Sequence, residues 1–551
     1  VKALAVDSGV LYVLGGMAGA DSEGGNIYKL STKDGSYLKW EGTESADLKI
    51  KSLWPEEAKV KPEKADELGF EGGRLIAVSR KARIAAALDP RTGKLLETIQ
   101  VTPPKDDNTR FLLKDGVAYV WRTNQQISVH SGGKLLRTMG RAGGRALLGP
   151  WQPDGLRAVN SMALDAEGKL WVAEGDGTPK RFSVWDPRSG KLVNEFFGPS
   201  SYGALGGAIC PTDPNVMVGQ GCEWQLDPQT GRARCTYVIT RDGMENSRFA
   251  VGANGRVYLA VAGKWAFNTG PLRIYERANG YKLRAEIFYA DKDGRELPAS
   301  GHGQTGKAAR TMVWSDANGD GLRQPDEISG VDGELRFSGW YMFVTPDLTL
   351  YSGSNQFKVT GFTACGAPKY DLTKPVKMPI SGLGSTDGRL VLSGGRYGET
   401  HTLLTCAELA SGRALWTYPD NFNGVHGSHN ACPPTVGMIR GSFGPCGAAR
   451  LPKPVGNVWV VPTNVGEWHI LTEDGFYLTG LFEGDPMKVK WPDQATPGVD
   501  RSHCPPGMGG EDFGGSIAQG LDGKIYVQAG KTAFWNLEVT GLEKVEELGL
   551  A

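Results

Sequence analysis

Two short phrases recur along the chain, and their recurrence constrains the fold more than any other feature. One phrase places a glycine-closed turn between two apolar segments, as in LDPRTGKLLETIQV from Leu88, WDPRSGKLVNEFFG from Trp185, LDPQTGRARCTYVI from Leu226 and ELASGRALWTYP from Glu408. The other phrase precedes it, as in ALDAEGKLWVAEG from Ala163, AVGANGRVYLAVA from Ala250 and AQGLDGKIYVQAG from Ala518. Alternating apolar residues on both sides of a polar turn predict a β-hairpin for each phrase.

Joining the two hairpins gives a four-stranded antiparallel sheet that recurs about every 40 to 50 residues. Such a sheet has two apolar faces, and radially arranged neighbours would cover both of them. The chain is therefore predicted to be all-β, a β-propeller of four-stranded blades with about 8 and up to 10 blade-like units. We expect residues 1–551 to form a single large propeller, with the weak units near residues 74 and 309 as decorations or a split blade.

An oxygen-rich segment, SDANGDGLRQPDE, lies within a predicted insertion at residues 309–330. Counted from Asp316, its oxygen-bearing residues match the EF-hand calcium loop, and Gly321 stands where that loop turns sharply. The predicted ligands are Asp316, Asn318, Asp320, Leu322 through its main-chain oxygen, Gln324 and Glu327. Because the preceding AARTMVW does not predict an amphipathic helix, we expect a structural Ca²⁺ in a loop and not a helix-loop-helix sensor.

The repeated phrases resemble known propeller repeats. The inner hairpins resemble NHL-type repeats, and AELASGRALW from Ala407 resembles the repeat of quinoprotein-like propellers, whose tryptophan docks between blades. The calcium loop is similar to those of dockerins, and its place before GWYMFVTPDLTLYSG looks like large secreted bacterial propeller proteins. This resemblance implies an architecture, but it carries no catalytic residues with it.

Composition indicates a compartment and excludes some partners. Positive and negative side chains balance at 61 each, so a nucleic acid partner is not expected. Eight cysteines occur without a CxxC motif, which favours disulfides in an oxidising compartment over buried free thiols. No apolar run approaches about 20 residues, so we expect no transmembrane segment. The opening VKALAVDSGV does not read as a signal peptide, and a secreted, cell-surface or periplasmic location is therefore inferred from the cysteines and the calcium loop.

Histidine gathers in two long predicted inter-blade loops, residues 421–450 and 491–513. The first loop contains HGSH, which separates two histidines by two small residues, and the second contains DRSHCPPGMGGEDFGG. Both loops precede the first strand of successive blades, so they should lie side by side at one rim. With the nearby SGGRYGETHT, they supply the candidate catalytic residues Arg396, Tyr397, His426, His429, Arg501, His503 and Glu511.

Three interpretations of these residues stay open. The pair His426 and His429 with a carboxylate would suit a second, transition-metal ion. Imidazole together with arginine, tyrosine and an acid would suit proton transfer on a sugar, as in the propeller-shaped polysaccharide lyases. Alternatively, the histidines hydrogen-bond to the backbone of disulfide-tied loops.

The segment VGEWHIL offers a further histidine in a predicted strand. Alternation along a strand sends Glu467 and His469 to one side and Trp468 to the other. For His469 a structural role is favoured over a functional one.

Three functions remain compatible with the sequence. The first is a secreted carbohydrate-active lyase or hydrolase that uses the histidine loops at the mouth of the propeller channel. The second is a metal- or quinone-dependent oxidoreductase. The third is a non-catalytic propeller that binds a polysaccharide, a glycan or a protein inside a larger extracellular assembly, because the chain starts and stops within blade-like sequence.

Overall fold

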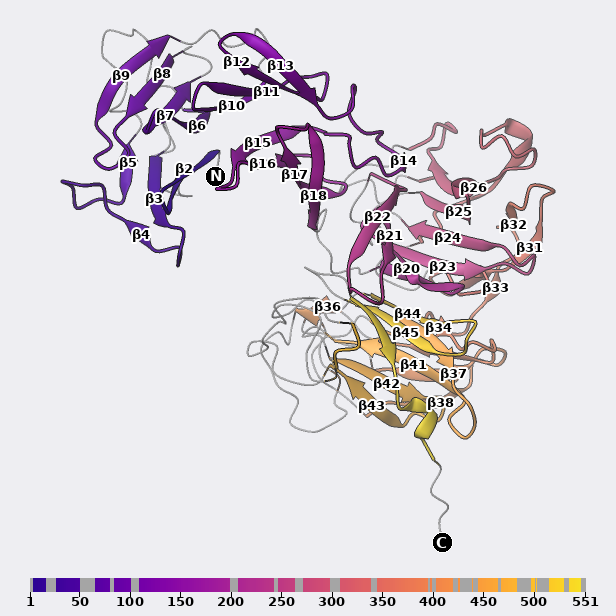
Figure 1. The fold of residues 1–551 in the computed structure, drawn as a ribbon. Helices are drawn as coiled ribbons and strands as arrows, with labels where there is room; N and C mark the ends of the chain where they lie inside the picture. Colours follow the sequence, from indigo (N-terminus) through magenta and orange to yellow (C-terminus); the bar gives the residue numbers. More distant parts are fainter. Residues whose placement is uncertain are drawn as a thin grey trace. The chain divides into compact units, whose positions relative to one another are not determined.

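The computed structural model is all-β and is built from small antiparallel sheets, as predicted (Figure 1). It describes residues 3–15, 26–49, 65–79, 84–100, 109–198, 207–241, 246–262, 271–297, 308–337, 344–394, 397–398, 403–419, 425–426, 439, 444–463, 467–482, 497–500, 502, 515–529 and 535–546. Contacts group the chain into two compact units. Unit 1 comprises Val1–Ala146, Gln152–Asp176 and Lys180–Phe197, and unit 2 comprises Leu147–Trp151, Gly177–Pro179 and Gly198–Ala551.

The single propeller that the repeats predict over residues 1–551 stays a prediction, and the two units are described separately. The repeated sequence phrases indicate how many hairpins a chain contains. Closure of a propeller ring depends instead on which sheet packs against the first sheet of the ring. That information lies in contacts between distant segments and not in the local turn chemistry.

Unit 1 contains four blades. The first is β1 (Ala3–Asp7), β2 (Val10–Gly15), β3 (Asn26–Ser31) and β4 (Tyr37–Leu38), with β5 (Asp47–Lys49) also paired to β3. The second is β6 (Glu67–Glu71), β7 (Arg74–Ser79), β8 (Ile84–Leu88) and β9 (Leu95–Gln100). The third is β10 (Arg110–Lys114), β11 (Val117–Trp121), β12 (Ile127–Ser131) and β13 (Lys134–Met139), and a parallel pairing of β10 with β6 joins it to the second in one eight-stranded sheet. The fourth is β15 (Val159–Leu164), β16 (Leu170–Glu174), β17 (Lys180–Asp186) and β18 (Lys191–Gly198).

Apolar side chains from facing blades of unit 1 share common clusters. Trp40 of the first blade packs with Phe70 of the second, and Trp185 of the fourth packs with Tyr119 of the third. Residue 74, which the sequence placed at the start of a weak unit, begins the second strand of a complete blade. The mutual covering of blade faces is the packing that the repeats predicted.

Within the described residues, the first half of unit 2 contains three larger sheets and a separate two-stranded hairpin. One is formed by β14 (Gly149–Pro150), β19 (Gly207–Cys210), β20 (Asp213–Gly219), β21 (Cys222–Leu226) and β22 (Ala233–Val238). The next has six strands, β23 (Asn246–Val251), β24 (Val257–Ala262), β25 (Leu272–Ala278), β26 (Gly280–Ala290), β27 (Arg310–Ser315) and β28 (Ile328–Asp332). The third contains β29 (Leu350–Ser352), β30 (Asn355–Phe357) and β33 (Val376–Lys377), beside the hairpin of β31 (Val359–Phe362) and β32 (Pro368–Tyr370).

The second half of unit 2 contains three further blades. They are β34 (Leu383–Gly384), β35 (Leu390–Ser393), β37 (Thr405–Glu408) and β38 (Ala414–Thr417); β40 (Gly447–Arg450), β41 (Asn457–Pro462), β42 (Trp468–Thr472) and β43 (Tyr477–Leu481); and β44 (Gly515–Gln519), β45 (Ile525–Ala529) and β46 (Trp535–Val539). A short pair, β36 (Tyr397–Gly398) and β39 (Val425–His426), joins two connecting segments. Single turns of 3₁₀ helix cover Pro325–Glu327 and Leu542–Lys544.

Two observations show how the sheets of unit 2 pack. Trp416, the tryptophan predicted to dock between blades, lies edge-on to Trp459 of the next blade with ring centroids 6.4 Å apart. In addition, β44 of the last blade contacts β19 of the first sheet of unit 2, and the Gln528 side chain accepts a hydrogen bond from the Gly207 amide. The weak unit predicted near residue 309 is β27–β28, which extends the sheet of β23–β26 and is not a separate blade.

Most of the described cysteines are core residues. No disulfide joins any two of the described cysteines, and all but Cys365 are buried: Cys210, Cys222, Cys235, Cys365, Cys406 and Cys446. Burial raises the pKa of the Cys406 and Cys446 thiols to about 12, which keeps them protonated and unreactive. The predicted disulfides are therefore not supported for these six residues, while Cys432 and Cys504 lie outside the described part of the chain.

Candidate functional site

The predicted calcium loop connects β27 to β28 in unit 2. A strand and not a helix precedes it, as expected, and its 3₁₀ turn ends at Glu327. Gly321 has a φ of +72°, the left-handed conformation that the sharp turn at this position requires. The local spacing therefore predicted the turn geometry correctly.

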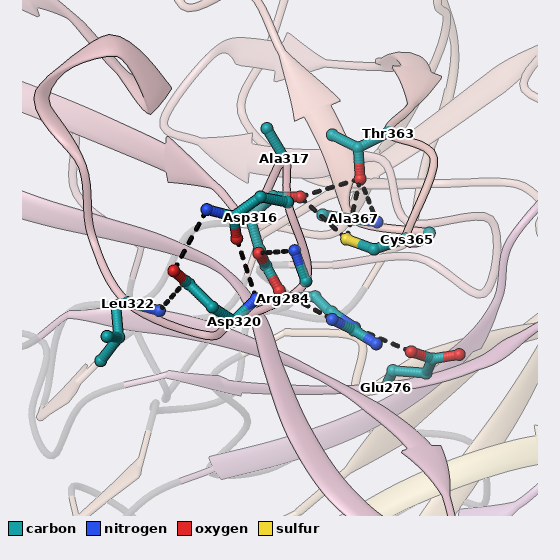
Figure 2. Close-up of polar contacts among 12 residues, drawn as sticks. Glu276, Arg284, Asp316, Ala317, Asp320, Leu322, Thr363, Cys365 and Ala367 are labelled. Atoms are coloured by element: carbon teal, nitrogen blue, oxygen red, sulfur yellow. Dashed lines mark hydrogen bonds and ion pairs between the residues drawn. The ribbon is translucent and has the colours of Figure 1, made fainter.

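Hydrogen bonds from the loop backbone organise its carboxylates (Figure 2). One carboxylate oxygen of Asp316 accepts from the Gly319 amide at 2.7 Å, and one oxygen of Asp320 accepts from the Leu322 amide at 2.7 Å. The Leu322 hydrogen bond is the main cause of the lowered pKa of Asp320. Glu327 closes the loop, because its oxygens accept from the Ala317 amide and from Trp314 Nε1, each at 2.7 Å.

Asp316 also ties the loop to the neighbouring strands. Its second carboxylate oxygen lies 2.7 Å from Arg284 Nη1, and Arg284 Nε donates to Glu276 at 2.8 Å (Figure 2). The main-chain oxygen of Asp316 accepts from Thr363 Oγ1 at 2.8 Å and from Cys365 Sγ at 3.0 Å. Asp316 is fully buried, so the start of the loop is held between the β23–β28 sheet and the β31–β32 hairpin.

The chemistry of the loop fits calcium in part. Its side-chain donors are oxygens, which Ca²⁺ prefers, and Glu327 returns to the start of the loop as a twelve-residue calcium loop requires. Within the described ranges, however, no three His, Cys, Asp or Glu side chains are gathered as a metal-binding group. The guanidinium of Arg284 also partly neutralises Asp316. Calcium binding by this loop stays a prediction.

The structure brings two of the predicted catalytic residues into adjacent strands. Strands β36 and β39 pair in parallel, with Tyr397 opposite Val425 and Gly398 opposite His426. Tyr397 and His426 therefore come from two different connecting segments and sit one position apart in register. The other five candidates lie outside the described residues; they are Arg396, His429, Arg501, His503 and Glu511. The proposed metal pair of His426 and His429 is therefore not tested.

The strand containing His469 has the alternation that the sequence predicted. His469 is 4% exposed, and its Nε2 lies 3.8 Å from the carboxylate of Glu467 on the same side of β42. The ring of Tyr477 on the adjacent strand β43 lies 5.4 Å from the imidazole. Thr463, which directly follows β41, has its amide hydrogen-bonded to the Glu467 carbonyl. Sequence reasoning did not single out Thr463, because a threonine after a strand carries no distinctive signal.

The comparisons with known proteins identify no family for this chain. No family model matches, and no curated protein matches. Among solved structures, a chain in the crystal structure of the mitotic checkpoint complex is similar at 13% sequence identity, over 59% of this chain and 85% of that chain, with a TM-score of 0.21. Separately, none of the helices within the described ranges has the length and apolar character needed to span a membrane.

Proposed function

We propose that the protein is a secreted or cell-surface β-propeller that acts on an acidic polysaccharide, at the segments where β36 pairs with β39. The observation that carries this proposal is the pairing of β36 with β39, which brings the backbones of Tyr397 and His426 onto neighbouring strands, one register position apart. A phenol and an imidazole on adjacent strands provide the two proton-transfer groups that a polysaccharide lyase needs.

In the proposed reaction, His426 removes the proton from the carbon next to the uronate carboxylate. The electron pair forms a carbon–carbon double bond as the bond to the glycosidic oxygen breaks, and Tyr397 gives its proton to that oxygen. Arg396 would neutralise the uronate carboxylate, which acidifies the neighbouring C–H bond. The reaction is balanced without an oxidant, a reductant or a second substrate.

The test is an assay of the full chain on a panel of uronate-containing polysaccharides, with ultraviolet absorbance of the unsaturated product as the readout. We expect His426→Ala and Tyr397→Phe each to lower kcat/KM by about 10²- to 10⁴-fold, the usual contribution of a proton-transfer group. His130→Ala is the matched control, since His130 lies in β12 of unit 1 and its imidazole hydrogen-bonds to the Ser128 hydroxyl. Its activity should equal that of the unmodified protein.

Two results would contradict the proposal. Full activity of His426→Ala would exclude this residue from the reaction. Binding of a polysaccharide without any unsaturated or hydrolysed product would instead identify a non-catalytic glycan-binding module.

A further inference from the structure

Arg284 of strand β26 brings a positive charge to the first residue of the predicted calcium loop. Asp316 is fully buried, and one of its carboxylate oxygens accepts a hydrogen bond from the Gly319 amide at 2.7 Å. Its other carboxylate oxygen lies 2.7 Å from Arg284 Nη1 (Figure 2). In an EF-hand loop, the residue at this position gives an oxygen to the metal. Here both oxygens of that residue already have partners within the protein.

The backbone of β26 positions Arg284 beside the loop. The register of β25 and β26 shifts between Ile274 and Tyr275, so Arg284 is the extra residue of a β-bulge and has no opposite residue in β25. A bulge changes the direction of a side chain relative to its strand. The Arg284 carbonyl also accepts a hydrogen bond from the Asp316 amide at 2.9 Å. The guanidinium is therefore held beside Asp316 by the sheet and not by the loop alone.

Glu276 holds the guanidinium of Arg284 from a second side. Arg284 Nε donates to one carboxylate oxygen of Glu276 at 2.8 Å, and Arg256 Nη1 donates to the other at 2.8 Å. The side chains of Arg284 and Glu276 are only 7% and 9% exposed. Two arginines and two carboxylates thus form a charge-balanced group, and the buried carboxylate of Asp316 has its counter-charge without a metal ion.

A calcium ion in this loop would add two positive charges next to that balanced group. Like charges in a site removed from water repel strongly. Glu327, at the last position of the loop, is also engaged, since it accepts hydrogen bonds from the Ala317 amide and from Trp314 Nε1. We propose that Arg284 is a built-in counter-charge for Asp316, which keeps the loop folded without calcium and lowers the affinity of the loop for the ion.

Hydrogen exchange of the full chain in a calcium chelator gives the first test. The Gly319 and Ala317 amides donate to the carboxylates of Asp316 and Glu327, so their protection reports on the folded loop. Both amides should stay protected when calcium is removed, because Arg284 continues to hold Asp316. Loss of their protection in the chelator would overturn the proposal, since the loop would then need the ion to fold.

Arg284→Met gives the second test, since methionine removes the charge and keeps an unbranched side chain. In the chelator, the Gly319 and Ala317 amides of this variant should exchange faster, because the buried Asp316 carboxylate lacks its counter-charge. Added calcium should restore their protection. In thermal unfolding, calcium should stabilise the variant at concentrations about 10-fold or more below those that affect the unmodified protein. Arg284→Lys keeps the positive charge and should respond to calcium as the unmodified protein does.

Arg277→Met is the matched control. Arg277 lies in the same sheet, in β25, and its Nε is 2.7 Å from the carboxylate of Glu223, which does not belong to the loop. That variant should lose stability, and its calcium response should equal that of the unmodified protein. The proposal is wrong if Arg284→Met responds to calcium no more strongly than the unmodified protein. It is equally wrong if Arg284→Lys responds as strongly as Arg284→Met, because the positive charge would then not be what limits calcium.

Discussion

Glu174→Gln is expected to destabilise unit 1 by about 3 to 5 kcal/mol, the largest stability change we expect from one substitution. The side chains of Glu174, Arg145 and Arg181 are almost completely removed from solvent. Glu174 accepts from Arg145, from Arg181 Nη1 at 2.8 Å and from the Arg157 amide at 2.9 Å. Glutamine keeps the shape but removes one of the three carboxylates, Glu174, Asp176 and Glu195, that balance Arg145, Arg157 and Arg181. A buried network left with excess positive charge is costly.

Hydrogen exchange of the native chain should localise this effect. Amides of β15–β18 are expected to exchange faster in Glu174→Gln, while those of the blades in unit 2 keep their protection. The matched control is Glu44→Gln, because Glu44 pairs with Lys39 at the surface with a side chain 93% exposed. That variant should show no measurable change, since exposed ion pairs contribute little. Equal stability of both variants would mean that the buried network does not depend on the charge of Glu174.

The individual hairpins of the fold could be predicted from the sequence, because their signals are local. In LDPRTGKLL, the Asp89 carboxylate accepts from the Arg91 and Thr92 amides, and Gly93 adopts a φ of +72°. These contacts lie within a few residues, so composition and spacing alone identify the turn between β8 and β9. Which blade packs against which is a non-local property, and the repeats contain no information about it.

The same distinction applies to the candidate site. The alternation of Glu467 and His469 and the turn at Gly321 were predicted correctly, because each follows from neighbouring positions. Arg284 was not anticipated beside Asp316, since their approach depends on the pairing of β26 with β27. Likewise, Thr463 became notable only because its hydroxyl is buried without a partner.

Calcium is expected to stabilise unit 2 through the loop at residues 316–327, if the predicted ligands bind it. A ligand that binds only the folded state at 100 times its Kd adds about 2.7 kcal/mol to the free energy of unfolding. The titration should extend to millimolar calcium, because Arg284 lies 2.7 Å from a carboxylate oxygen of Asp316 and weakens the attraction for a cation. Thermal unfolding with added calcium or with a chelator measures the shift.

Asp320→Ala is the most informative variant for this prediction, because the folded loop does not depend on the Asp320 side chain for contacts to the rest of the protein. Asp316 and Glu327 both hold the folded loop through hydrogen bonds to its backbone, so replacing either would confound loss of metal with loss of structure. Asp320 is exposed and bonds only within the loop, to Leu322, Asn318 and Gln324. Its replacement should abolish the calcium response and change the calcium-free stability little, whereas Asp293→Ala, in an exposed turn outside the loop, should retain the response. If calcium stabilises the Asp320→Ala variant as much as the unmodified protein, the ion binds elsewhere. If calcium does not stabilise the unmodified protein, the prediction is wrong, and the hydrogen bonds of the loop together with Arg284 are enough to keep it folded.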